Sequence, residues 1–306
     1  IAEDRTICTN EKNIDLEIAA PTISNALFTW YDSDLASAAV LGTGKSLIVS
    51  PVTTTTYYAG VQGDDVCINV AGSRKAVKVT VNPVAKVSDI SAADQTICNG
   101  ETAILTATSP LVNPLFVWYT DPDLENSISN TETAEVSPSV TTTYYVTVSA
   151  DGVCTIPPPA KAVVVTVNPL PTGSIQATGP VCIGDTTAPV VSFTGTNGTA
   201  PYTFTYKVNN GSDMTVSTVG SNNIVNVPVS TATAGSFVYT LVSVKDSSST
   251  ACVQLQTGTA TVTINPLPTA SITATGPVCK GDKTVPLVTF TGANGTPPYT
   301  FTYRSE

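Results

Sequence analysis

The sequence contains no histidine and very little charge. Among its 306 residues there are one methionine and two tryptophans, and only 12% are charged, where about 25% is usual. The missing histidine removes the usual general base, the commonest zinc ligand and every Ser-His or Cys-His nucleophile pair. We therefore expect no catalytic residue, no bound metal and no cofactor in this chain.

Positive charge and long apolar runs are also scarce. The formal net charge is −10 with only 13 lysines and arginines, so the surface repels nucleic acid and anionic lipid. No run approaches the roughly 18 to 20 apolar residues of a transmembrane helix, so we expect no membrane insertion. The first residues, "IAEDRTIC", lack the basic and apolar regions of a signal peptide, which means either that a signal was removed or that this is an interior fragment.

Threonine, serine, valine and proline fill the place of charged residues, and this mixture favours strands and turns over helices. Three alternating segments end alike, "KAVKVTVNP" at 75–83, "KAVVVTVNP" at 161–169 and "TATVTINP" at 259–266. Proline stops each strand because it cannot donate to a sheet. Cutting there predicts an all-β chain of four segments, 1–83, 84–169, 170–266 and 267–306.

The segments are of two repeat types. The first two, type A, share "TIC", an aromatic "F-x-W-Y" and "TTTYY". The last two, type B, match without a gap between 170–207 and 267–304, with 28 of 38 positions identical at a constant offset of 97. This indicates a recent tandem duplication, with the fourth segment being a truncated repeat.

Type A units resemble immunoglobulin-like sandwiches, because "L-T-A", Trp118 and "Y-Y-V" follow one another like strands B, C and F. Where an immunoglobulin has its inter-sheet disulfide, the second unit has Ala107 and Val146, and the first has Ile18 and Ala59. Each unit has one large and one small residue at these two positions, in opposite order in the two units. Such an exchange keeps the total volume of the core side chains constant. We predict that each pair packs across the sandwich, beside Trp118 in the second unit and beside the equivalent tryptophan in the first, Trp30.

Each complete unit contains two cysteines, one early and one in the loop before the last strand. The simplest pairing is within a unit, Cys8–Cys67, Cys98–Cys154 and Cys182–Cys252, giving one disulfide per domain and an oxidising, extracellular setting. The same spacing assigns Cys279 a partner beyond residue 306. A metal site is the rival interpretation, but it lacks Cys-x-x-Cys spacing and histidine.

Several other residues are candidate sites with a plainer alternative. Asp32, Asp34, Asp121 and Asp123 fall in predicted loops, where carboxylates hold Ca²⁺ or simply form solvated turns. An aromatic stripe, Tyr202, Phe204 and Tyr206, and its repeat Tyr299, Phe301 and Tyr303, lies on one face of a strand and either binds sugar or fills a core. The core interpretation is favoured.

The motifs "ATGPVC.GD", "FTG.NGT.PYTFTY", "NPLPT" and "TIC…F.WY…TTTYY…VTVNP" together resemble the immunoglobulin-like and PKD-like repeats of giant cell-surface proteins of Bacteroidota, in particular SprB-type gliding-motility adhesins. The resemblance implies type IX secretion, a long filament attached to the outer membrane, and contact with motility or secretion machinery and surface polysaccharide. It also gives "DTT" at 185–187 the form of a glycosylation tripeptide, centred on Thr186.

We therefore expect a non-catalytic stalk segment of a large secreted adhesin, in which short proline-rich linkers join neighbouring repeats into a rod. Two alternatives remain. One is an accessory region of a large secreted polysaccharide-degrading enzyme, and the other is a carbohydrate-binding array that uses the aromatic stripe.

Overall fold

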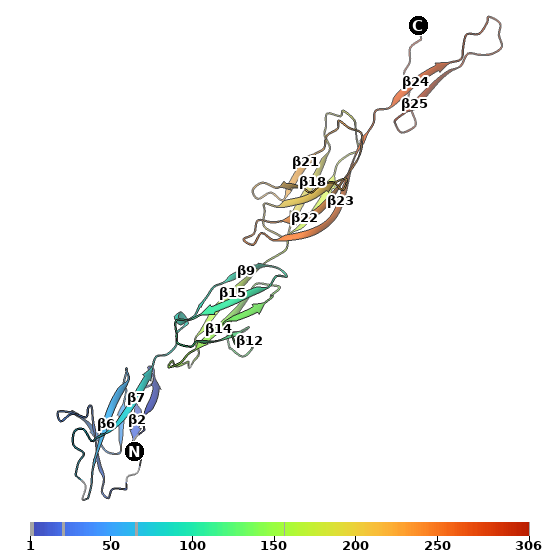
Figure 1. Ribbon diagram of the computed structural model, residues 1–306. Coiled ribbons are helices and arrows are strands. Elements are labelled where there is room, and N and C mark those ends of the chain that lie inside the picture. The colour runs from blue at the N-terminus through green and yellow to red at the C-terminus, as the bar shows by residue number, and fades with distance from the viewer. Residues whose placement is uncertain (1–2, 20–21, 65–66, 156, 306) are drawn as a thin grey trace. The chain divides into compact units, whose positions relative to one another are not determined.

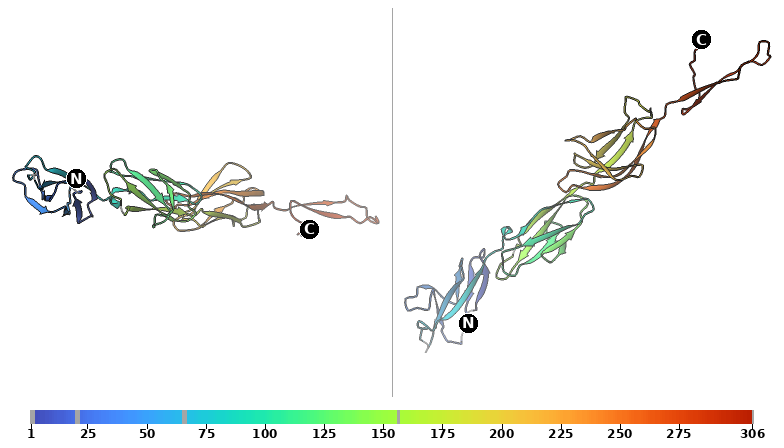
Figure 2. Two further views of the ribbon diagram at one scale, coloured as in Figure 1. Left: turned by 90° about the horizontal axis from the view of Figure 1, so that it is seen from below. Right: turned by 45° about the horizontal axis from the view of Figure 1, so that its top comes forward.

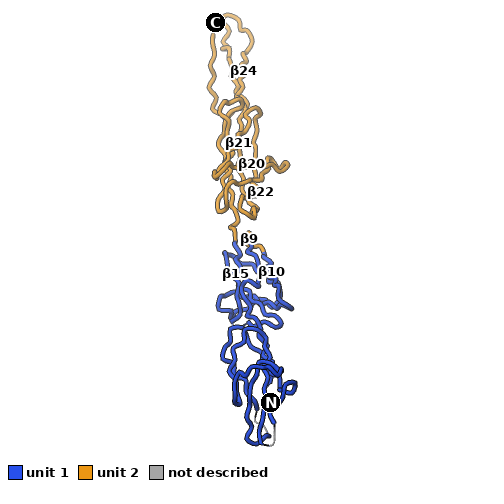
Figure 3. Tube along the Cα trace, turned by 90° about the vertical axis from the view of Figure 1, so that its left-hand side faces the viewer, with its two compact units in different colours: residues 1–95, 102–166 blue, residues 96–101, 167–306 orange. Residues whose placement is uncertain are grey.

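The computed structural model describes residues 3–19, 22–64, 67–155 and 157–305, and within them the protein is built from strands and one short 3-10 helix (Figure 1). Contacts divide the chain into two compact units, residues 1–95 with 102–166, and residues 96–101 with 167–306 (Figure 3). The border between the units runs through two strands, β9 (Gln95–Cys98) and β15 (Ala160–Asn168), which are neighbours in one sheet. The all-β class of tandem immunoglobulin-like domains is confirmed, whereas the four segment boundaries stay a prediction.

The first repeat folds into two sheets. One has the strand order β1-β7-β6-β3-β4 and the other pairs β2 with β5. Alternation decides which side chains turn inward: Val77 and Val79 on the last strand are fully buried while Lys78 between them is exposed. The strands are β1 (Arg5–Cys8), β2 (Ile14–Glu17), β3 (Leu27–Tyr31), β4 (Val40–Thr43), β5 (Ser46–Val49), β6 (Thr55–Gln62) and β7 (Lys75–Asn82).

The second repeat has the same two-layer plan, with sheets of order β12-β11-β14-β15-β9 and β13-β10-β8. Strand β10 shows strict alternation of buried and exposed residues, as expected of a sheet with one face on the core. After the 3-10 helix (Val87–Asp89), the remaining elements are β8 (Ser91–Ala92), β10 (Ala103–Thr108), β11 (Leu115–Tyr119), β12 (Ser127–Ser129), β13 (Thr133–Val136) and β14 (Thr142–Ser149).

The third repeat lies in the second unit, yellow to orange in Figures 1 and 2. Its sheets have the order β17-β23-β22-β19-β20 and β16-β18-β21, and they enclose a core with several aromatic rings. The strands are β16 (Thr172–Ala177), β17 (Val181–Cys182), β18 (Val190–Thr196), β19 (Thr203–Val208), β20 (Met214–Ser217), β21 (Ile224–Pro228), β22 (Gly235–Lys245) and β23 (Val253–Asn265).

In residues 267–305, β24 (Thr269–Ala274) pairs antiparallel with β25 (Val288–Ala293), red in Figures 1 and 2. This is the same pairing as β16 with β18 in the third repeat, shifted by 97 residues: Ile175 lies opposite Phe193, and Ile272 opposite Phe290. The sequence duplication is therefore also a structural one over these strands.

Candidate functional site: the cysteine junctions

Two disulfides join residues of neighbouring repeats. Cys8 is bonded to Cys154, with Cα atoms 5.8 Å apart, and Cys98 is bonded to Cys252, with Cα atoms 5.7 Å apart. Each bond connects the early cysteine of one repeat with the late cysteine of the next repeat along the chain. The first bond lies within unit 1 and the second within unit 2.

The early cysteine of each repeat is held beside the asparagine that ends the repeat's last strand. Cys8 is the parallel-sheet partner of Asn82, and Cys182 is that of Asn265. In all three repeats the residue after the cysteine donates its amide hydrogen to the asparagine carbonyl, at 2.9 Å from Thr9 to Asn82, 2.9 Å from Asn99 to Asn168 and 2.8 Å from Ile183 to Asn265. The "NP" motif therefore positions a cysteine as well as ending a strand.

The late cysteine precedes the last strand, so it lies at the strand's other end. In the third repeat, Cys252 comes directly before β23, whose 13 residues span about 40 Å at roughly 3.3 Å per residue. A disulfide requires Cα atoms within about 7 Å. The expected pairings within repeats, Cys8–Cys67, Cys98–Cys154 and Cys182–Cys252, are therefore wrong, because the last strand holds the two cysteines of a repeat apart.

In unit 1, backbone hydrogen bonds support the junction. The amide of Cys154 donates to the carbonyl of Pro83 at 2.8 Å, and the carbonyl of Cys154 accepts from the amide of Ala85 at 2.8 Å. Val84 between them forms an isolated parallel bridge with Cys154. The segment after the first "NP" is thereby paired with the loop that supplies the second repeat's cysteine.

In unit 2, side chains hold the corresponding loop, residues 246–252. The hydroxyl oxygen of Thr250 lies 3.2 Å from both sulfurs of the Cys98–Cys252 bond, and the side-chain amide of Asn168 donates to it at 3.0 Å. On the loop's other side, the buried carboxylate of Asp246 accepts from the amide of Thr199 at 3.0 Å. The loop is thus bound on one side by the second repeat and on the other by its own repeat.

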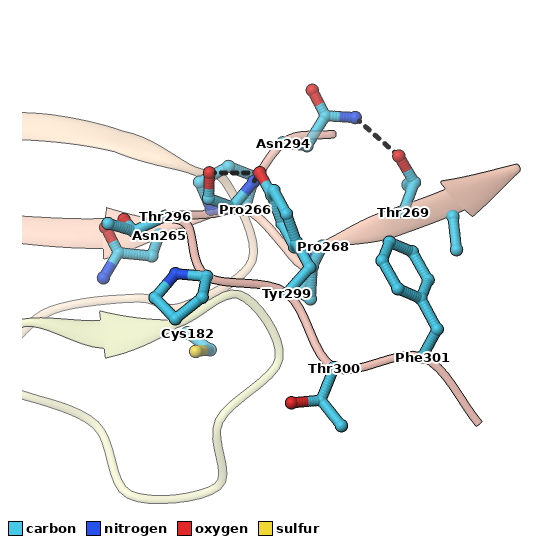
Figure 4. Close-up of a pocket in the computed structure, with 13 residues that line it drawn as sticks. Cys182, Asn265, Pro266, Pro268, Thr269, Asn294, Thr296, Tyr299, Thr300 and Phe301 are labelled. Atoms are coloured by element: carbon cyan, nitrogen blue, oxygen red, sulfur yellow. Dashed lines mark hydrogen bonds between the residues drawn. The ribbon is translucent and has the colours of Figure 1, made fainter. Parts of the chain in front are cut away.

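The third cysteine of the early type, Cys182, is exposed and carries no disulfide. It lines a pocket of about 660 Å³ together with Asn265 and with residues of 266–301, among them Gly295, Thr296 and Tyr299. Figure 4 shows Cys182 and Asn265 on one side of this pocket and Phe301 on the other. The pocket is therefore lined both by the end of the third repeat and by the beginning of the next repeat.

Cys67 and Cys279 are likewise exposed and unpaired in the described part of the chain. The sequence predicted a partner for Cys279 some 70 residues downstream. That prediction assumed pairing within a repeat, which the two observed disulfides contradict.

Three of the aspartates proposed for Ca²⁺, Asp32, Asp34 and Asp121, accept hydrogen bonds from backbone amides. Asp32 accepts from the amide of Ala39 and Asp34 from that of Gly72, both at 2.9 Å. The amides of Glu125 and Asn126 donate to Asp121, and the Glu125 hydrogen bond is the main cause that lowers the pKa of Asp121. Across the described residues, no three His, Cys, Asp or Glu side chains form a metal-binding group. Calcium binding stays a prediction.

The aromatic stripe of the third repeat lies in the core: Tyr202, Phe204 and Tyr206 are at most 4% exposed. The hydroxyl of Tyr202 donates to the carbonyl of Gly198 at 2.7 Å. Its ring covers Gly195 so closely that a Cβ there would lie 2.4 Å from the ring. The motif "FTG.NGT.PYTFTY" is thus a folding element, and this stripe offers no sugar-binding surface.

The remaining predicted residues are Thr186 and the residues proposed for the cores of the first two repeats. Thr186 is exposed in a loop, where its glycosylation stays a prediction. Trp30 and Trp118 are fully buried, as are Ala107 and Val146, and Ile18 and Ala59 are 7% and 8% exposed. In the first repeat, Ile18, Ala59 and Trp30 belong to one core cluster. The packing of each exchanged pair across the sheets stays a prediction.

No helix in the described part of the chain is long and apolar enough to cross a membrane.

The comparison with curated proteins found no match. Among solved structures, an I-band fragment of titin is 13% identical over 87% of this chain and 96% of the fragment, with a TM-score of 0.39. The ectodomain of mouse nectin-like molecule 4 is 10% identical over 86% and 97%, with a TM-score of 0.37. A Ca²⁺-stabilized adhesin with which an Antarctic bacterium binds ice is 15% identical over 88% and 74%, with a TM-score of 0.39.

A family model described as "Ig-like domain CHU_C associated" matches residues 1–83 and again residues 86–169. Both matches fall on the type A repeats, whose strands form the two-layer sandwiches described above. Since the matches cover more than half of the sequence, the chain belongs to the family of CHU_C-associated Ig-like domains.

Proposed function

We propose that this chain is a non-catalytic, tension-resisting stalk segment of a large secreted cell-surface adhesin. The observation that carries the proposal is the interleaving of the two disulfides: Cys98 lies between Cys8 and Cys154 in the sequence, and Cys154 lies between Cys98 and Cys252. A chain pulled at its ends is therefore held by two overlapping covalent loops.

The interleaving shortens the covalent path under tension. Through the two bonds, the path from Cys8 to Cys252 uses only the roughly 56 residues between Cys98 and Cys154, and about 190 residues of backbone stay out of it. Even with every sandwich unfolded, those residues cannot lengthen the chain until a disulfide breaks. Such a limit on extension suits a passive spacer between a cell and an attachment point.

The setting of the proposed stalk is extracellular. Structural disulfides persist in oxidising compartments, and two disulfides join residues of this chain. The resemblance to gliding-motility adhesins supports the finer proposals of type IX secretion, outer-membrane attachment, and contact with motility machinery and surface polysaccharide. Antibody labelling of intact producing cells, before and after protease shaving, tests the surface location.

Single-molecule stretching tests the stalk function. The chain is held at its two ends and unfolded, first oxidised and then with a reductant. We expect the reduced chain to extend further by roughly 650 Å, from about 190 released residues at about 3.5 Å each. Equal extension in both states would refute the proposed role of the disulfides in tension.

A further inference from the structure

Cys182 stands in the same surroundings as Cys98. Each lies beside the last asparagine of its repeat, and the amide of the following residue donates to that asparagine's carbonyl, Asn168 at Cys98 and Asn265 at Cys182. Asn265 lies 97 residues after Asn168, the offset that relates the type B repeats. The end of the third repeat therefore repeats the backbone hydrogen bond found at the end of the second repeat.

At Cys98 this arrangement holds a partner loop, residues 246–252 with the sequence "DSSSTAC". The disulfide fixes Cys252, and the Asn168 side chain donates to Thr250. The equivalent groups beside Cys182 bind no such loop. The Cys182 thiol is exposed, and the side chain of Asn265 has no hydrogen-bond partner among the described residues.

The opposite wall of the pocket supplies the second half of the loop's binding site. In the third repeat, the loop is anchored to Thr199, whose amide donates to Asp246 and whose carbonyl accepts from the amide of Ser247 at 2.9 Å. The equivalent of Thr199 at the offset of 97 is Thr296, and it lines the same pocket as Cys182 and Asn265. Both walls that hold a "DSSSTAC" loop are therefore present around this pocket.

We propose that the pocket of Cys182, Asn265 and Thr296 is the receiving site for the cysteine loop of a type B repeat that begins at residue 267. The loop cysteine forms a disulfide with Cys182, its threonine accepts a hydrogen bond from Asn265, and its aspartate accepts one from the amide of Thr296. The junction then repeats the covalent link between Cys98 and Cys252, so the cross-linking continues from repeat to repeat.

The chemistry is an ordinary two-electron oxidation. The two thiols lose two electrons and two protons as the S–S bond forms, and a small-molecule disulfide such as oxidised glutathione takes them up and is reduced to two thiols. The pocket itself supplies proximity, because both walls position the loop before the bond forms.

The test is a chain in which a second copy of residues 210–266 follows residue 306, which completes the fourth repeat in register. After refolding in a glutathione redox buffer, peptide mapping without reduction should link Cys182 to the added cysteine and leave Cys67 and Cys279 as thiols. A bond between the added cysteine and Cys279, or an added cysteine that stays reduced, would overturn the proposal.

Two variants of the extended chain sharpen the result. Asn265→Ala should lower the equilibrium constant for the new disulfide about fivefold, the effect of one lost hydrogen bond of about 1 kcal/mol. Asn222→Ala, which removes an exposed amide side chain outside the pocket, is the matched control and should leave it unchanged. Equal effects of the two substitutions on the equilibrium constant would show that the Asn265 side chain does not bind the loop.

This inference extends the proposed function without being its basis. The stalk proposal depends on the Cys8–Cys154 and Cys98–Cys252 bonds, which the same peptide map detects separately. A map that shows both of these bonds but no bond at Cys182 would refute the receiving site alone.

Discussion

Cys98 and Cys252 are bonded to each other although 154 residues separate them in the sequence and they belong to different repeats. Cys98 is placed at the end of the second repeat by the hydrogen bond between Asn99 and Asn168. Cys252 is placed at the start of β23, where the third repeat's last strand begins. The bond therefore connects the end of the second repeat with the start of the last strand of the third repeat.

Peptide mapping of the folded chain of residues 1–306 without reduction should recover two linked pairs, Cys8–Cys154 and Cys98–Cys252, because these are the pairs bonded among the described residues. A thiol assay without denaturant should count three reactive groups, since Cys67, Cys182 and Cys279 are all exposed. Recovery of Cys98 linked to Cys154 would contradict the structure.

Removal of the second disulfide should destabilise the third repeat. In the double variant Cys98→Ala, Cys252→Ala, the free energy of unfolding of this repeat should fall by roughly 4 kcal/mol, because a long loop is no longer closed while the second repeat stays folded. Hydrogen exchange of the β23 amides, measured by mass spectrometry, reports this change for one repeat.

The control for this variant is Cys279→Ala, which removes an exposed cysteine without a partner. It should leave exchange in β23 unchanged. If the double variant and the control behave alike, the bond contributes nothing to the stability of the third repeat.

The exchanged core pairs predict a compensating substitution. Ala107 and Val146 come from opposite sheets of the second repeat, and both are fully buried. Ala107→Ile overfills the core and Val146→Ala leaves a cavity, so each alone should cost about 1–3 kcal/mol. Together they should restore at least about 1 kcal/mol of the summed loss, as measured by calorimetric unfolding of the three variants. Strictly additive losses would show that the two side chains do not share one space.

The close approach of Tyr202 to Gly195 predicts that glycine is required there. Gly195→Ala would bring a Cβ to 2.4 Å from the tyrosine ring, and the forced shift should cost roughly 1–3 kcal/mol. Gly276→Ala is the matched control, because nothing lies within 4 Å of the added Cβ. Denaturant unfolding measures the free energy of unfolding of both variants. An unchanged free energy in Gly195→Ala would contradict the close packing of Tyr202 on Gly195.

The loop held by Asp121 should loosen in acid. The amide of Glu125 stabilises the ionised carboxylate and lowers the pKa of Asp121 below its ordinary value of about 3.9. Since the folded pKa is the lower one, the stabilisation is present above about pH 3.9 and is lost as the pH falls through the folded value. An NMR titration of the Asp121 carboxyl carbon should give a midpoint below 3.9, and a midpoint at or above it would refute the hydrogen-bonded geometry.

Much of the fold could be predicted from local patterns. Alternation in "KAVVVTVNP", the proline that ends it, and the aromatic positions around Trp118 determine strands and buried faces, because they depend on residues that are near in sequence. The duplication found at the offset of 97 extends to the structure, because β24 and β25 pair as β16 and β18 do. Burial of the stripe around Phe204 followed from the same alternation.

The cysteine pairing could not be predicted in this way. Spacing along the sequence made Cys98 and Cys154 natural partners, since each repeat contains one early and one late cysteine. Only the tertiary structure showed that the strands ending at Cys8 and Cys182 pair in parallel with the last strands of their repeats. That parallel pairing carries the early cysteine to the far end of the sandwich, and a strand of 13 residues then separates Cys182 from Cys252. The sequence by itself determined the strands, the core and the repeats, whereas the tertiary structure decided which sulfurs are close enough to bond.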